Sequence, residues 1–502
     1  MSNAVQGPGA GPRTITTSVP ARLDRLPWSR WHWMIVIGLG TVWILDGLEV
    51  TVVGNIASRL SEPGSGLAIS DAQVTGLGAA LYVAGACAGA LFFGWLTDRF
   101  GRKKLFLVTL AVYLAATAMT ALSFTAWWFF LFRFLTGFGI GGEYAAINSA
   151  IDELIPSKYR GRVDLIINGS YWLGAMGGAL LSVLALNTDL LPKDIGWRLT
   201  FALGVVLGLV ILLVRRHVPE SPRWMFIHGK EEGAEKLLDD VEHTVEEETG
   251  RRLPEPGSSI TIEQRTSVGF VEIARTLFKS YPKRAVLGFS LFIGQAFLYN
   301  AITFGFSSIL VKFFDVSSGT TGYFFAVIAF GNFLGPLLLG KLFDTVGRRK
   351  MIAGTYVLSG VLLFVTAWLF AQGWLNSTTM TACWCVVLFF ASAGASSAYL
   401  TVSEIFPMET RAMAIALFYA IGTAAGGISG PLVFSALTSS GVVGDAVLAF
   451  SIGAALMTAA GVVAAFLAVD AEGKSLEDIA APLSARLAAT GEGPTPPGAP
   501  AA

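Results

Sequence analysis

Charged residues are scarce in this sequence. Asp, Glu, Lys and Arg make up only 14% of its 502 residues, against about 25% in soluble domains. The 35 acidic and 35 basic side chains cancel to a formal net charge of zero. A chain without a basic excess lacks the electrostatic attraction that nucleic acid requires, so we expect no nucleic-acid partner.

Cysteine and histidine are also rare. The three cysteines, which all fall within apolar runs, are Cys87, Cys383 and Cys385. The four histidines, which fall near predicted helix ends or in loops, are His32, His217, His228 and His243. The cysteines therefore resemble small buried hydrophobes, and a metal site would need further ligands. The sequence predicts no metal ion, no cofactor and no histidine proton relay within the membrane.

Long apolar runs are what the sequence has in abundance. A stretch of about 20 apolar residues is long enough to span a bilayer as a helix. The first six such helices are expected at residues 31–57, 72–97, 104–124, 126–154, 163–187 and 197–217. Six more are expected at 284–309, 319–343, 350–372, 379–402, 412–437 and 443–469. The sequence thus predicts an all-α membrane protein with twelve transmembrane helices in two six-helix bundles.

The polar segments divide the chain into five parts. Residues 1–26 are rich in Gly, Pro, Ser and Thr and lack the apolar core of a signal peptide, so we expect a disordered tail. The bundles occupy residues 27–217 and 284–470, and a charged, partly helical linker at 218–283 joins them. Residues 471–502 form a second, cytoplasmic tail, which we expect to be disordered after about residue 480. We expect the chain to function as a monomer in the lipid bilayer.

Lys and Arg are unevenly distributed between the loops. One set of loops holds Arg99, Arg102, Lys103, Lys104, Lys158, Arg160, Arg162, Arg348, Arg349, Lys350 and Arg411. The opposite set holds little beyond Arg59, Lys193, Arg198 and Lys312. Because short cytoplasmic loops carry the excess of Lys and Arg, the first set and both termini are expected in the cytoplasm. This pattern predicts a multi-pass protein of the cytoplasmic membrane.

Two basic turns repeat the same pattern in the two halves. Gly94–Lys104 and Gly340–Lys350 each contain Gly, then Asp four residues on, then Gly-Arg and two basic residues. In each half a Glu also lies three residues before a Pro and an Arg four residues after it: Glu153, Pro156 and Arg160, then Glu404, Pro407 and Arg411. The halves are therefore parallel repeats, an arrangement that lets one bundle rock against the other around a central site.

Four charged side chains lie within the apolar spans of the first half: Asp46, Glu49, Arg133 and Glu143. A charge inside a bilayer costs several kcal/mol, so it is usually functional or paired. Asp46 and Glu49 share one helix face, and Asp46 falls between Arg133 and Glu143 in depth. We interpret the group as a proton-coupling site in which Asp46, backed by Glu49, carries the proton and Arg133 sets its pKa. The alternative is that these charges only hold helices together.

The spans of the second half carry polar and aromatic side chains in place of charges. They include Gln295, Tyr299, Asn300, Trp384 and Tyr399. Uncharged hydrogen-bonding groups beside aromatic rings suit a small polar solute, although ordinary helix packing explains any one of them equally well. We therefore expect solute recognition mainly in the second half and proton coupling in the first.

The basic turns and the Glu/Arg repeats resemble those of the major facilitator superfamily, over nearly the whole chain. Within it the sequence is most similar to the sugar-porter and related metabolite branch. The motifs that carry this similarity are Pro219–Trp224, Glu404–Pro407 with Arg411, and Gly473–Ile479. The resemblance implies that Asp46 or Glu49 couples the proton together with Arg133. It also implies that Gln295 and Asn300 hold the solute.

The resemblance has departures at the expected solute site. Asn168 stands where sugar porters have a Gln in the fifth helix, and Tyr399 where they have a Trp in the tenth. Phe304 and Gly305 replace a pair of tyrosines. The stretch from Asp46 to Gly54 is instead similar to the first helix of aromatic-acid, niacin-type and synaptic-vesicle-type transporters.

A conformational latch is also implied by the resemblance. Asp98 ends its helix and would meet the positive N-terminal end of the eleventh helix, while Glu153 would pair with Arg102. The latch residues are Gly94, Asp98, Arg99, Gly101, Arg102, Glu153, Arg160, Gly340, Asp344, Arg348, Glu404 and Arg411. These contacts are expected to hold the cytoplasmic side shut.

These features together predict a secondary transporter and not an enzyme. We expect proton symport of a small polar metabolite of the sugar, polyol or organic acid type by alternating access. A proton-driven exporter of drugs or organic cations stays open, because the membrane acids could attract cations. A transporter-like receptor that binds solute without moving it is the second alternative, and the 218–283 segment is the only place from which it could signal.

Overall fold

The computed structural model describes residues 14–67, 69–70, 72–215, 219–257, 259–263, 275–317, 319–407 and 411–480. Residues 1–13 and 481–502 of the two predicted tails lie outside this part of the chain. The side chains of Asp98 and Arg102 also lie outside it, so the contacts expected of them in the latch stay predictions.

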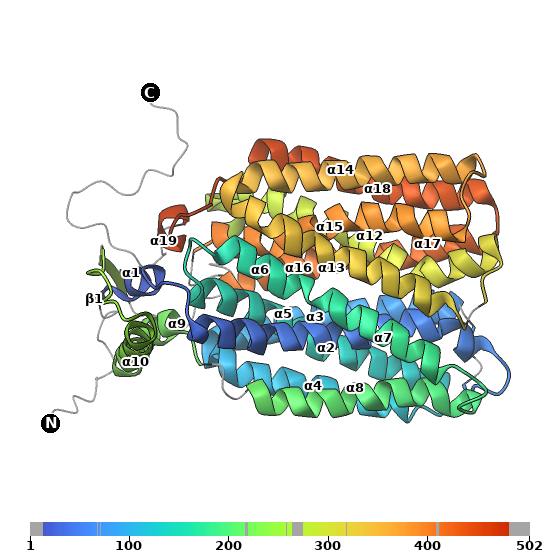
Figure 1. The fold of residues 1–502 in the computed structure, drawn as a ribbon, viewed down its shortest axis with the longest axis horizontal. Helices are drawn as coiled ribbons and strands as arrows, with labels where there is room; N and C mark the ends of the chain where they lie inside the picture. Colours follow the sequence, from blue (N-terminus) through green and yellow to red (C-terminus); the bar gives the residue numbers. More distant parts are fainter. Residues whose placement is uncertain are drawn as a thin grey trace.

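The first half of the chain forms six membrane passages. They are α2 (Arg30–Ser61), η1 (Gln73–Gly78) continuing into α3 (Ala79–Phe100), α4 (Arg102–Ala121), α5 (Ala126–Leu154), α6 (Arg160–Gly169) continuing into α7 (Tyr171–Ala185), and α8 (Lys193–Arg215). Apolar segments form helices in lipid because every backbone polar group must find its partner within the segment. Figure 1 shows these helices, in blue to green, as one bundle.

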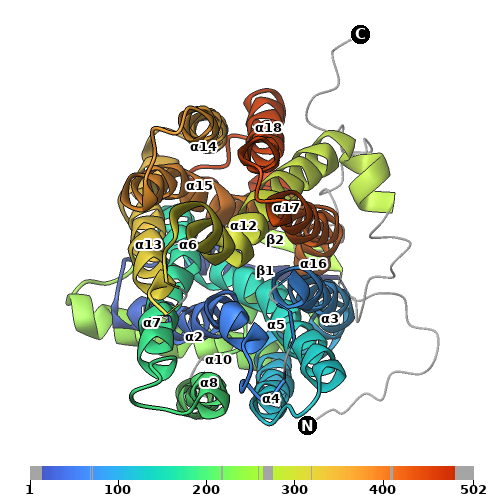
Figure 2. The ribbon, with the colours of Figure 1, turned by 90° about the vertical axis from the view of Figure 1, so that its right-hand side faces the viewer.

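The second half forms the other six passages. They are α12 (Pro282–Phe314), α13 (Thr321–Thr345), α14 (Arg348–Ala371), α15 (Ser377–Ile405), α16 (Arg411–Thr423) continuing through η3 (Ala424–Ile428) into α17 (Ser429–Ser439), and α18 (Val443–Leu467). Asn376 starts α15 as an N-cap, since its Oδ1 accepts a hydrogen bond from the Thr379 amide at 2.9 Å. Figure 2, which looks along the helices, shows this half packed against the first.

Ten of the passages, within the described residues, are long and apolar enough to cross a membrane by length and composition. The other two are α5, which carries Arg133, Glu143, Asp152 and Glu153, and the pair α6 and α7, which is interrupted at Ser170. Counting these, the chain has twelve passages in two six-helix bundles, and the predicted fold class is confirmed.

Glycines allow the helices of the first bundle to approach closely. A Cβ atom on Gly141 of α5 would lie 1.9 Å from the carbonyl oxygen of Ala86 in α3. A Cβ on Gly47 of α2 would lie 1.8 Å from the carbonyl oxygen of Tyr171 at the start of α7. No side chain fits at either position, so backbone-to-backbone contact fixes how α2 and α5 present their polar residues.

Both basic turns end a helix with a glycine in a left-handed conformation. Gly101 has φ +96° between α3 and α4, and Gly347 has φ +113° between α13 and α14. Only glycine adopts such angles without strain, so these positions reverse the chain in the space of one residue. We call the end of the molecule that holds Gly101 and Gly347 the basic end.

A cap covers the basic end. It consists of β1 (Thr14–Thr17), α1 (Val19–Asp24), α9 (Pro222–Ile227), α10 (Glu231–Thr249) and β2 (Ile260–Glu263). The two strands pair antiparallel, with Thr14 opposite Glu263. Figure 1 shows α1, α9 and α10 beyond one end of the bundles, with α19 (Leu476–Ile479) close by. The described ends of the chain therefore lie at the same end of the molecule.

The expectation of a disordered tail over residues 1–26 is wrong for residues 14–24. Val19, Leu23 and Leu26 are buried in a cluster with Leu238 and Val241 of α10. Arg22 donates hydrogen bonds to Glu242 and Asp239 at 2.6–2.9 Å and also pairs with Glu235. The polar composition of the segment suggested that the entropy cost of ordering it would not be met. The apolar contacts with α10 and the ion pairs of Arg22 offset that cost. In the second tail, residues 476–479 form α19.

Candidate functional site

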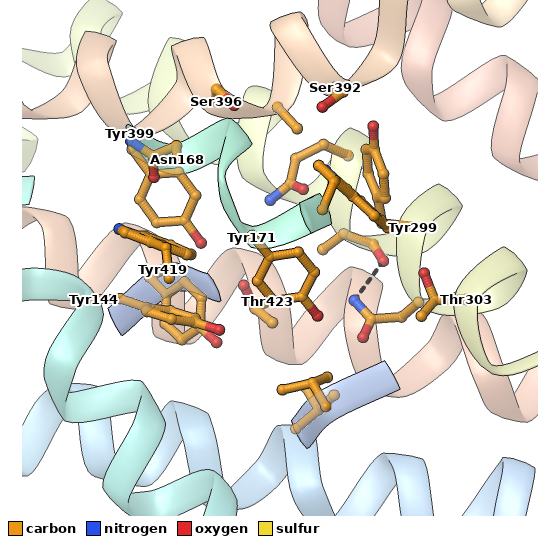
Figure 3. Close-up of a pocket in the computed structure, with 18 of the residues that line it drawn as sticks. Tyr144, Asn168, Tyr171, Tyr299, Thr303, Ser392, Ser396, Tyr399, Tyr419 and Thr423 are labelled. Atoms are coloured by element: carbon orange, nitrogen blue, oxygen red, sulfur yellow. Dashed lines mark hydrogen bonds between the residues drawn. The ribbon is translucent and has the colours of Figure 1, made fainter. Parts of the chain in front are cut away.

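A cavity of about 140 Å³ lies between the two bundles. The first half lines it with Trp43, Val50, Tyr82, Val83, Tyr144, Asn168, Tyr171 and Trp172. The second half lines it with Gln295, Ala296, Tyr299, Asn300, Thr303, Phe304, Ser392, Ala395, Ser396, Tyr399, Tyr419 and Thr423. Figure 3 shows these side chains converging from helices of both bundles. A solute held here would therefore contact both halves at once.

Aromatic rings make up much of the cavity wall. Nine of the lining residues are Trp, Tyr or Phe, and none of those described is charged. Trp43 stacks on Tyr144 with ring centroids 4.6 Å apart, and Tyr399 meets Tyr419 at 6.2 Å. A cavity of about 150 Å³ is large enough for benzene, so this one matches a solute the size of a single six-membered ring.

Several buried polar atoms at the cavity are free to hydrogen-bond with a solute. Trp43 Nε1, Asn168 Oδ1 and Thr423 Oγ1 are buried without a hydrogen-bond partner among the described residues. Leaving such a group unsatisfied costs about 1–3 kcal/mol, whereas a bound solute or water would restore the bond. The cavity therefore offers one N–H donor, one carbonyl acceptor and one hydroxyl that can serve as either.

Other polar groups at the cavity are held in place by neighbouring groups. Tyr299 donates to Asn332 Oδ1 at 3.0 Å, and the Asn300 amide donates to the Ala296 carbonyl at 2.8 Å. Asn168 Nδ2 donates to Asn148 Oδ1 at 3.1 Å, which orients its Oδ1. These bonds fix the side chains before a solute arrives, so little rotamer entropy remains to be lost on binding.

Five of the six predicted solute residues line the cavity: Asn168, Gln295, Tyr299, Asn300 and Tyr399. Trp384 does not. It is fully buried against Phe450, with ring centroids 6.1 Å apart. Trp384 lies eight residues before the lining residue Ser392, which is roughly 12 Å along α15. This displacement along the helix axis excludes it from the site.

The sequence predicts solute recognition mainly in the second half, and the cavity is lined by both halves. The first half contributes five of the rings around the cavity: Trp43, Tyr82, Tyr144, Tyr171 and Trp172. The sequence held a signal for them, because each Tyr and Trp brings a polar tip into an otherwise apolar span. A Tyr or Trp in an apolar span can face either a cavity or the lipid, and the sequence does not distinguish these two positions. The packing of α2, α5 and α7 against the second half shows which rings face the cavity.

The four predicted membrane charges are all buried, with side chains no more than 1% exposed. Arg133 Nη1 lies 3.1 Å from Glu49 Oε1, and Thr117 donates to the same oxygen at 3.2 Å. The structure thus pairs Arg133 with Glu49, one of the two acids that the sequence analysis placed with it. Gly47 packs on Tyr171 and so fixes the rotation of α2 about its axis. The positions of Asp46 and Glu49 along the helix did not reveal this rotation.

Tyr82 connects this ion pair to the cavity. The Arg133 guanidinium lies 5.0 Å from the centre of the Tyr82 ring, and Tyr82 lines the cavity. A cation over an aromatic face is stabilised by the ring quadrupole. Glu143 lies elsewhere on α5, roughly 15 Å along the helix from Arg133, and accepts a hydrogen bond from Thr109 at 3.3 Å.

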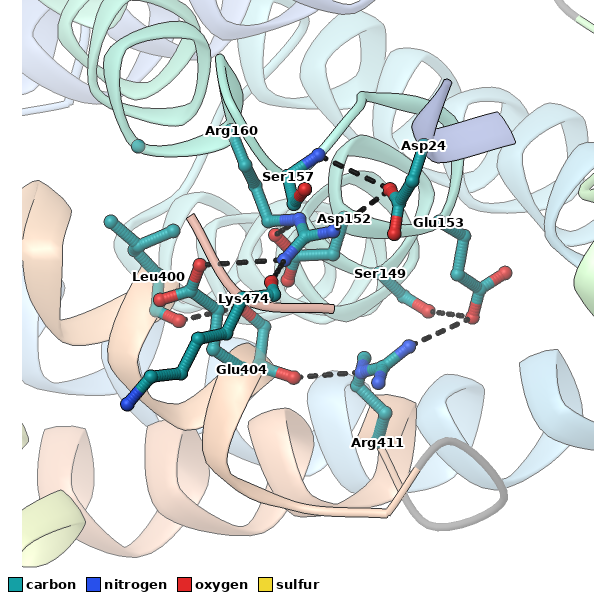
Figure 4. Close-up of polar contacts among 12 residues, drawn as sticks. Asp24, Ser149, Asp152, Glu153, Ser157, Arg160, Leu400, Glu404, Arg411 and Lys474 are labelled. Atoms are coloured by element: carbon teal, nitrogen blue, oxygen red, sulfur yellow. Dashed lines mark hydrogen bonds and ion pairs between the residues drawn. The ribbon is translucent and has the colours of Figure 1, made fainter. Parts of the chain in front are cut away.

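Ion pairs cross between the two halves at the basic end. Arg160 at the start of α6 lies 3.6 Å from Glu404 of α15, and Arg411 of α16 lies 3.9 Å from Glu153 of α5. Figure 4 shows both pairs side by side, with Asp152 and Asp24 next to Arg160. We call the set Asp152, Glu153, Arg160, Asp344, Arg348, Glu404 and Arg411 the basic-end gate.

Asp344 caps a helix of the opposite half. It lies near the end of α13, and its carboxylate accepts hydrogen bonds from the Gly161 and Arg162 amides at 3.2 and 2.8 Å. Those amides are the unpaired, partly positive start of α6. Arg348 holds the same carboxylate at 2.9 Å and Glu404 at 3.0 Å. The second basic turn thus makes the kind of contact that the sequence predicted for Asp98.

The remaining latch residues take part in packing. Gly94 lets α3 approach α16, because a Cβ atom there would lie 2.6 Å from the Ala416 Cβ. A Cβ atom on Gly340 would lie 3.6 Å from the Cα atom of Arg162 in the other half. Arg99 places its guanidinium 5.9 Å from the ring of Trp95. In the described part of the chain, no group of three His, Cys, Asp or Glu side chains is arranged to hold a metal ion.

A membrane fold of two six-helix bundles, with a cavity between them and ion pairs across one end, is that of a major facilitator transporter. The sequence matches the family described as sugar (and other) transporter over residues 30–482, and the chain belongs to that family. Its family and fold are those of transporters and not of enzymes.

Similar proteins include transporters of several solutes. The niacin transporter NiaP of Acinetobacter baylyi is 25% identical over 414 residues, covering 82% of this chain and 89% of that protein. The 4-hydroxybenzoate transporter PcaK of the same organism is 27% identical over 409 residues, covering 80% and 84%. Myo-inositol transporter 2 of Schizosaccharomyces pombe is 27% identical over 405 residues, covering 77% and 70%.

A solved structure has the same fold. The proton:xylose symporter XylE bound to 6-bromo-6-deoxy-D-glucose superposes with a TM-score of 0.72 at 17% identity. The match covers 90% of this chain and 98% of that structure.

Proposed function

We propose that this protein is a proton-coupled secondary transporter that imports a small polar metabolite by alternating access. The observation that carries the proposal is a cavity of about 140 Å³ lined by both halves, with ion pairs joining those halves at the basic end. A site at the interface of two repeats changes its exposure when one repeat rocks against the other.

The basic-end gate supplies the mechanical part of this cycle. Arg160–Glu404 and Arg411–Glu153 join the halves, as do the hydrogen bonds from the start of α6 to Asp344. All of them must part before the cavity opens at this end. Solute and proton bias the equilibrium only through their different affinities for the two states. We orient the basic end, the cap and both termini toward the cytoplasm of a cell bounded by this membrane.

The buried charges of α2 and α5 are the proposed proton-coupling site. Glu49 pairs with Arg133 at 3.1 Å, and Asp46 lies one turn earlier on α2. The protonation of a carboxyl group depends on its burial and on its distance to a cation. Rocking of the halves changes both quantities, which allows a proton taken up on one side to be released on the other.

The cavity is the proposed solute site. Its aromatic wall favours stacking against a ring, and Trp43, Asn168 and Thr423 supply unsatisfied polar atoms. A cyclic sugar, a polyol or a ring-bearing organic acid meets these conditions. Among the similar proteins are transporters of niacin, 4-hydroxybenzoate and myo-inositol, so these solutes are the first candidates.

Uptake into proteoliposomes tests the proposal. We would measure the accumulation of labelled niacin, 4-hydroxybenzoate, myo-inositol and xylose with an inside-alkaline, an inside-acid and no pH gradient. Accumulation against the solute gradient only in inside-alkaline vesicles supports symport, and a proton ionophore should abolish it. Accumulation only in inside-acid vesicles would identify an antiporter, and binding without any uptake would identify a receptor.

A further inference from the structure

Asp164 is a buried carboxyl group to which the proposed function gives no role. It lies on α6, four residues after Arg160 of the gate and four residues before Asn168 of the cavity. Residues four apart share one helix face, so Asp164 lies between the gate and the solute site. Its side chain is 0% exposed.

The Asp164 carboxylate lacks the partners that a buried negative charge requires. Neither of its oxygens accepts a hydrogen bond of regular geometry from a described residue, although the Asn168 amide lies close enough to act on it. The neighbouring Asn168 amide donates elsewhere, to the Asp164 backbone carbonyl at 2.9 Å and to Asn148 at 3.1 Å. The amides at the start of α6, which could stabilise a charge, already donate to Asp344.

The charged groups near Asp164 are two carboxylates and one guanidinium. The nearby charges that act on it are Asp152 of α5, Glu404 of α15 and Arg348 of α14. Arg348 is held by Glu404 and Asp344, and Arg160 of α6 lies 3.6–3.9 Å from Glu404 and Asp152. The arginines Arg160 and Arg348 thus already pair with other carboxylates, and an ionised Asp164 would add one more negative charge.

The remaining helices that pack on α6 complete this environment. Helix α2 meets α6 at Gly40, whose carbonyl accepts a hydrogen bond from Ser170 at 3.1 Å. The titratable side chains of α2 are Arg30 and His32 on one side of that point and Asp46, Glu49 and Arg59 on the other. Helix α7 contributes Tyr171, and α13 contributes Asp344. An ionised Asp164 would therefore face mainly other carboxylates.

We propose that Asp164 is a second proton-binding group, which holds a proton while the basic-end gate is closed and loses it to water when the gate opens. Burying an unpaired carboxylate costs several kcal/mol, and protonation avoids that cost. When α6 and α15 separate, water reaches the group and stabilises its charge. Closure and proton binding then favour each other reciprocally. This site is additional to Asp46 and Glu49, and it does not depend on solute transport.

Distance measurements across the gate test this coupling. Spin labels at Lys158 and Lys350, both exposed, would report the separation of the halves in a chain whose cysteines are replaced. The coupling rests on the alternating access of the proposed function, but the measurement needs no solute and no gradient, so the coupling can fail while solute transport is retained. We expect the open population of the parent protein to rise about tenfold between acidic and alkaline pH, the change that a shift of one pKa unit between the states produces.

Three variants separate Asp164 from other acids. Asp164→Asn mimics the protonated form and should stay closed, with less than a twofold change over the same pH range. Asp164→Glu retains a titrating group and should keep the pH response. Asp478→Asn neutralises an exposed acid at the same end and should behave as the parent. An unchanged pH response in Asp164→Asn would overturn the proposal.

Infrared difference spectroscopy detects the proton on the carboxyl group directly and requires no distance label. Spectra of the parent protein at low minus high pH should contain a protonated carboxyl C=O band that Asp164→Asn loses. A band of equal intensity in the parent and in Asp164→Asn would show that the proton resides elsewhere. If Asp164→Asn does not fold, the band should instead shift in Asp164→Glu, and an unshifted band there also overturns the assignment.

Discussion

Arg133 is the residue that connects the proposed proton site to the solute cavity. It forms an ion pair with Glu49 at 3.1 Å and lies over the Tyr82 ring, which lines the cavity. Both side chains of the pair are fully buried. Breaking such a pair by removing one partner costs about 3–5 kcal/mol, because it leaves the other charge uncompensated. Loss of stability and loss of coupling must therefore be told apart in any test.

Neutralising the two acids of α2 should uncouple transport from the proton gradient. We expect Asp46→Asn to abolish gradient-driven uptake while solute binding and solute exchange persist. Glu49→Gln should also lower the melting temperature, because it leaves Arg133 without its carboxylate. Adding Arg133→Met to Glu49→Gln should restore stability but not coupling. Uptake, exchange and thermal unfolding would be measured on the same preparations.

If Asp46→Asn retains full accumulation, Glu49 or Glu143 carries the proton or the protein is a uniporter. If Glu49→Gln alone abolishes it, the proton role belongs to Glu49.

The polar atoms of the cavity make a second prediction at the residue scale. Thr423→Val keeps the shape of the side chain but removes its hydroxyl. We expect it to weaken solute binding by about 1 kcal/mol, which is about fivefold in Kd, through the loss of one hydrogen bond. Trp384→Phe is the control, because Trp384 lies outside the cavity. Equal losses in both variants, measured by titration calorimetry, would place the solute elsewhere.

At the scale of elements, the cap is the part that the sequence predicted least well. Helix α1 docks on α10 through Leu23 and Leu238 and through Arg22 with Glu242. Asp24 at its end accepts a hydrogen bond from the Ser157 amide at 3.2 Å and lies 3.7 Å from Arg160. The N-terminal segment thereby reaches the basic-end gate. Composition suggested disorder, because the apolar positions of α1 gain a partner only when α10 is present.

Docking of α1 should weaken in acid. Burial opposes the charged form of Glu242, but hydrogen bonds from Arg22 and Arg25 outweigh it and hold its pKa below the ordinary 4.5. A group with a lowered pKa stabilises docking above its ordinary pKa, and this contribution is lost as the pH falls through the lowered value. The protection of the α1 amides against hydrogen exchange, relative to their intrinsic rates, should therefore fall as the pH drops below 4.5.

Glu242→Gln tests whether Glu242 causes this acid response. The variant should exchange faster than the parent at neutral pH and show little further acceleration in acid. Glu247→Gln, a change at an exposed position of the same helix, is the control. An acid response of Glu242→Gln equal to that of the parent would assign the effect to another group.

At the scale of the whole molecule, the two halves meet at the cavity and at the basic-end gate. Helices α6 and α7 of the first half pack on α13 of the second, and α3 packs on α16. The cavity wall and the gate are both built from residues distant in sequence, such as Arg160 and Glu404. Relative motion of the halves therefore changes both sites together, which is the requirement for alternating access.

The orientation of the molecule gives a direct prediction. A cysteine at Thr378, exposed in the first turn of α15, should react with an impermeant maleimide in intact cells. A cysteine at Thr244, exposed on α10 of the cap, should react only after the cells are permeabilised. Both are placed in a chain without Cys87, Cys383 and Cys385. The reverse pattern would place the basic end outside the cell.

The sequence by itself determined the fold and predicted five of the side chains that line the cavity. Its apolar runs predict the membrane passages, because a segment that long and that apolar is stable only as a helix in lipid. The two basic turns predict two repeated halves, and Gln295 and Asn300 are polar side chains in an apolar span, which marked them before any contact was known. These signals are local, and each can be read within one helix.

Only the tertiary structure decided which side chains meet. In the structure Arg133 pairs with Glu49, and α1 packs on α10. Trp43 and Tyr171 lie in the cavity wall, whereas Trp384 packs on Phe450 outside it. The rotation and tilt of each helix depend on its neighbours, as the contact of Gly47 with Tyr171 shows. An error of one residue in a helix turns a side chain by about 100°, so helical periodicity places residues in depth but not in direction.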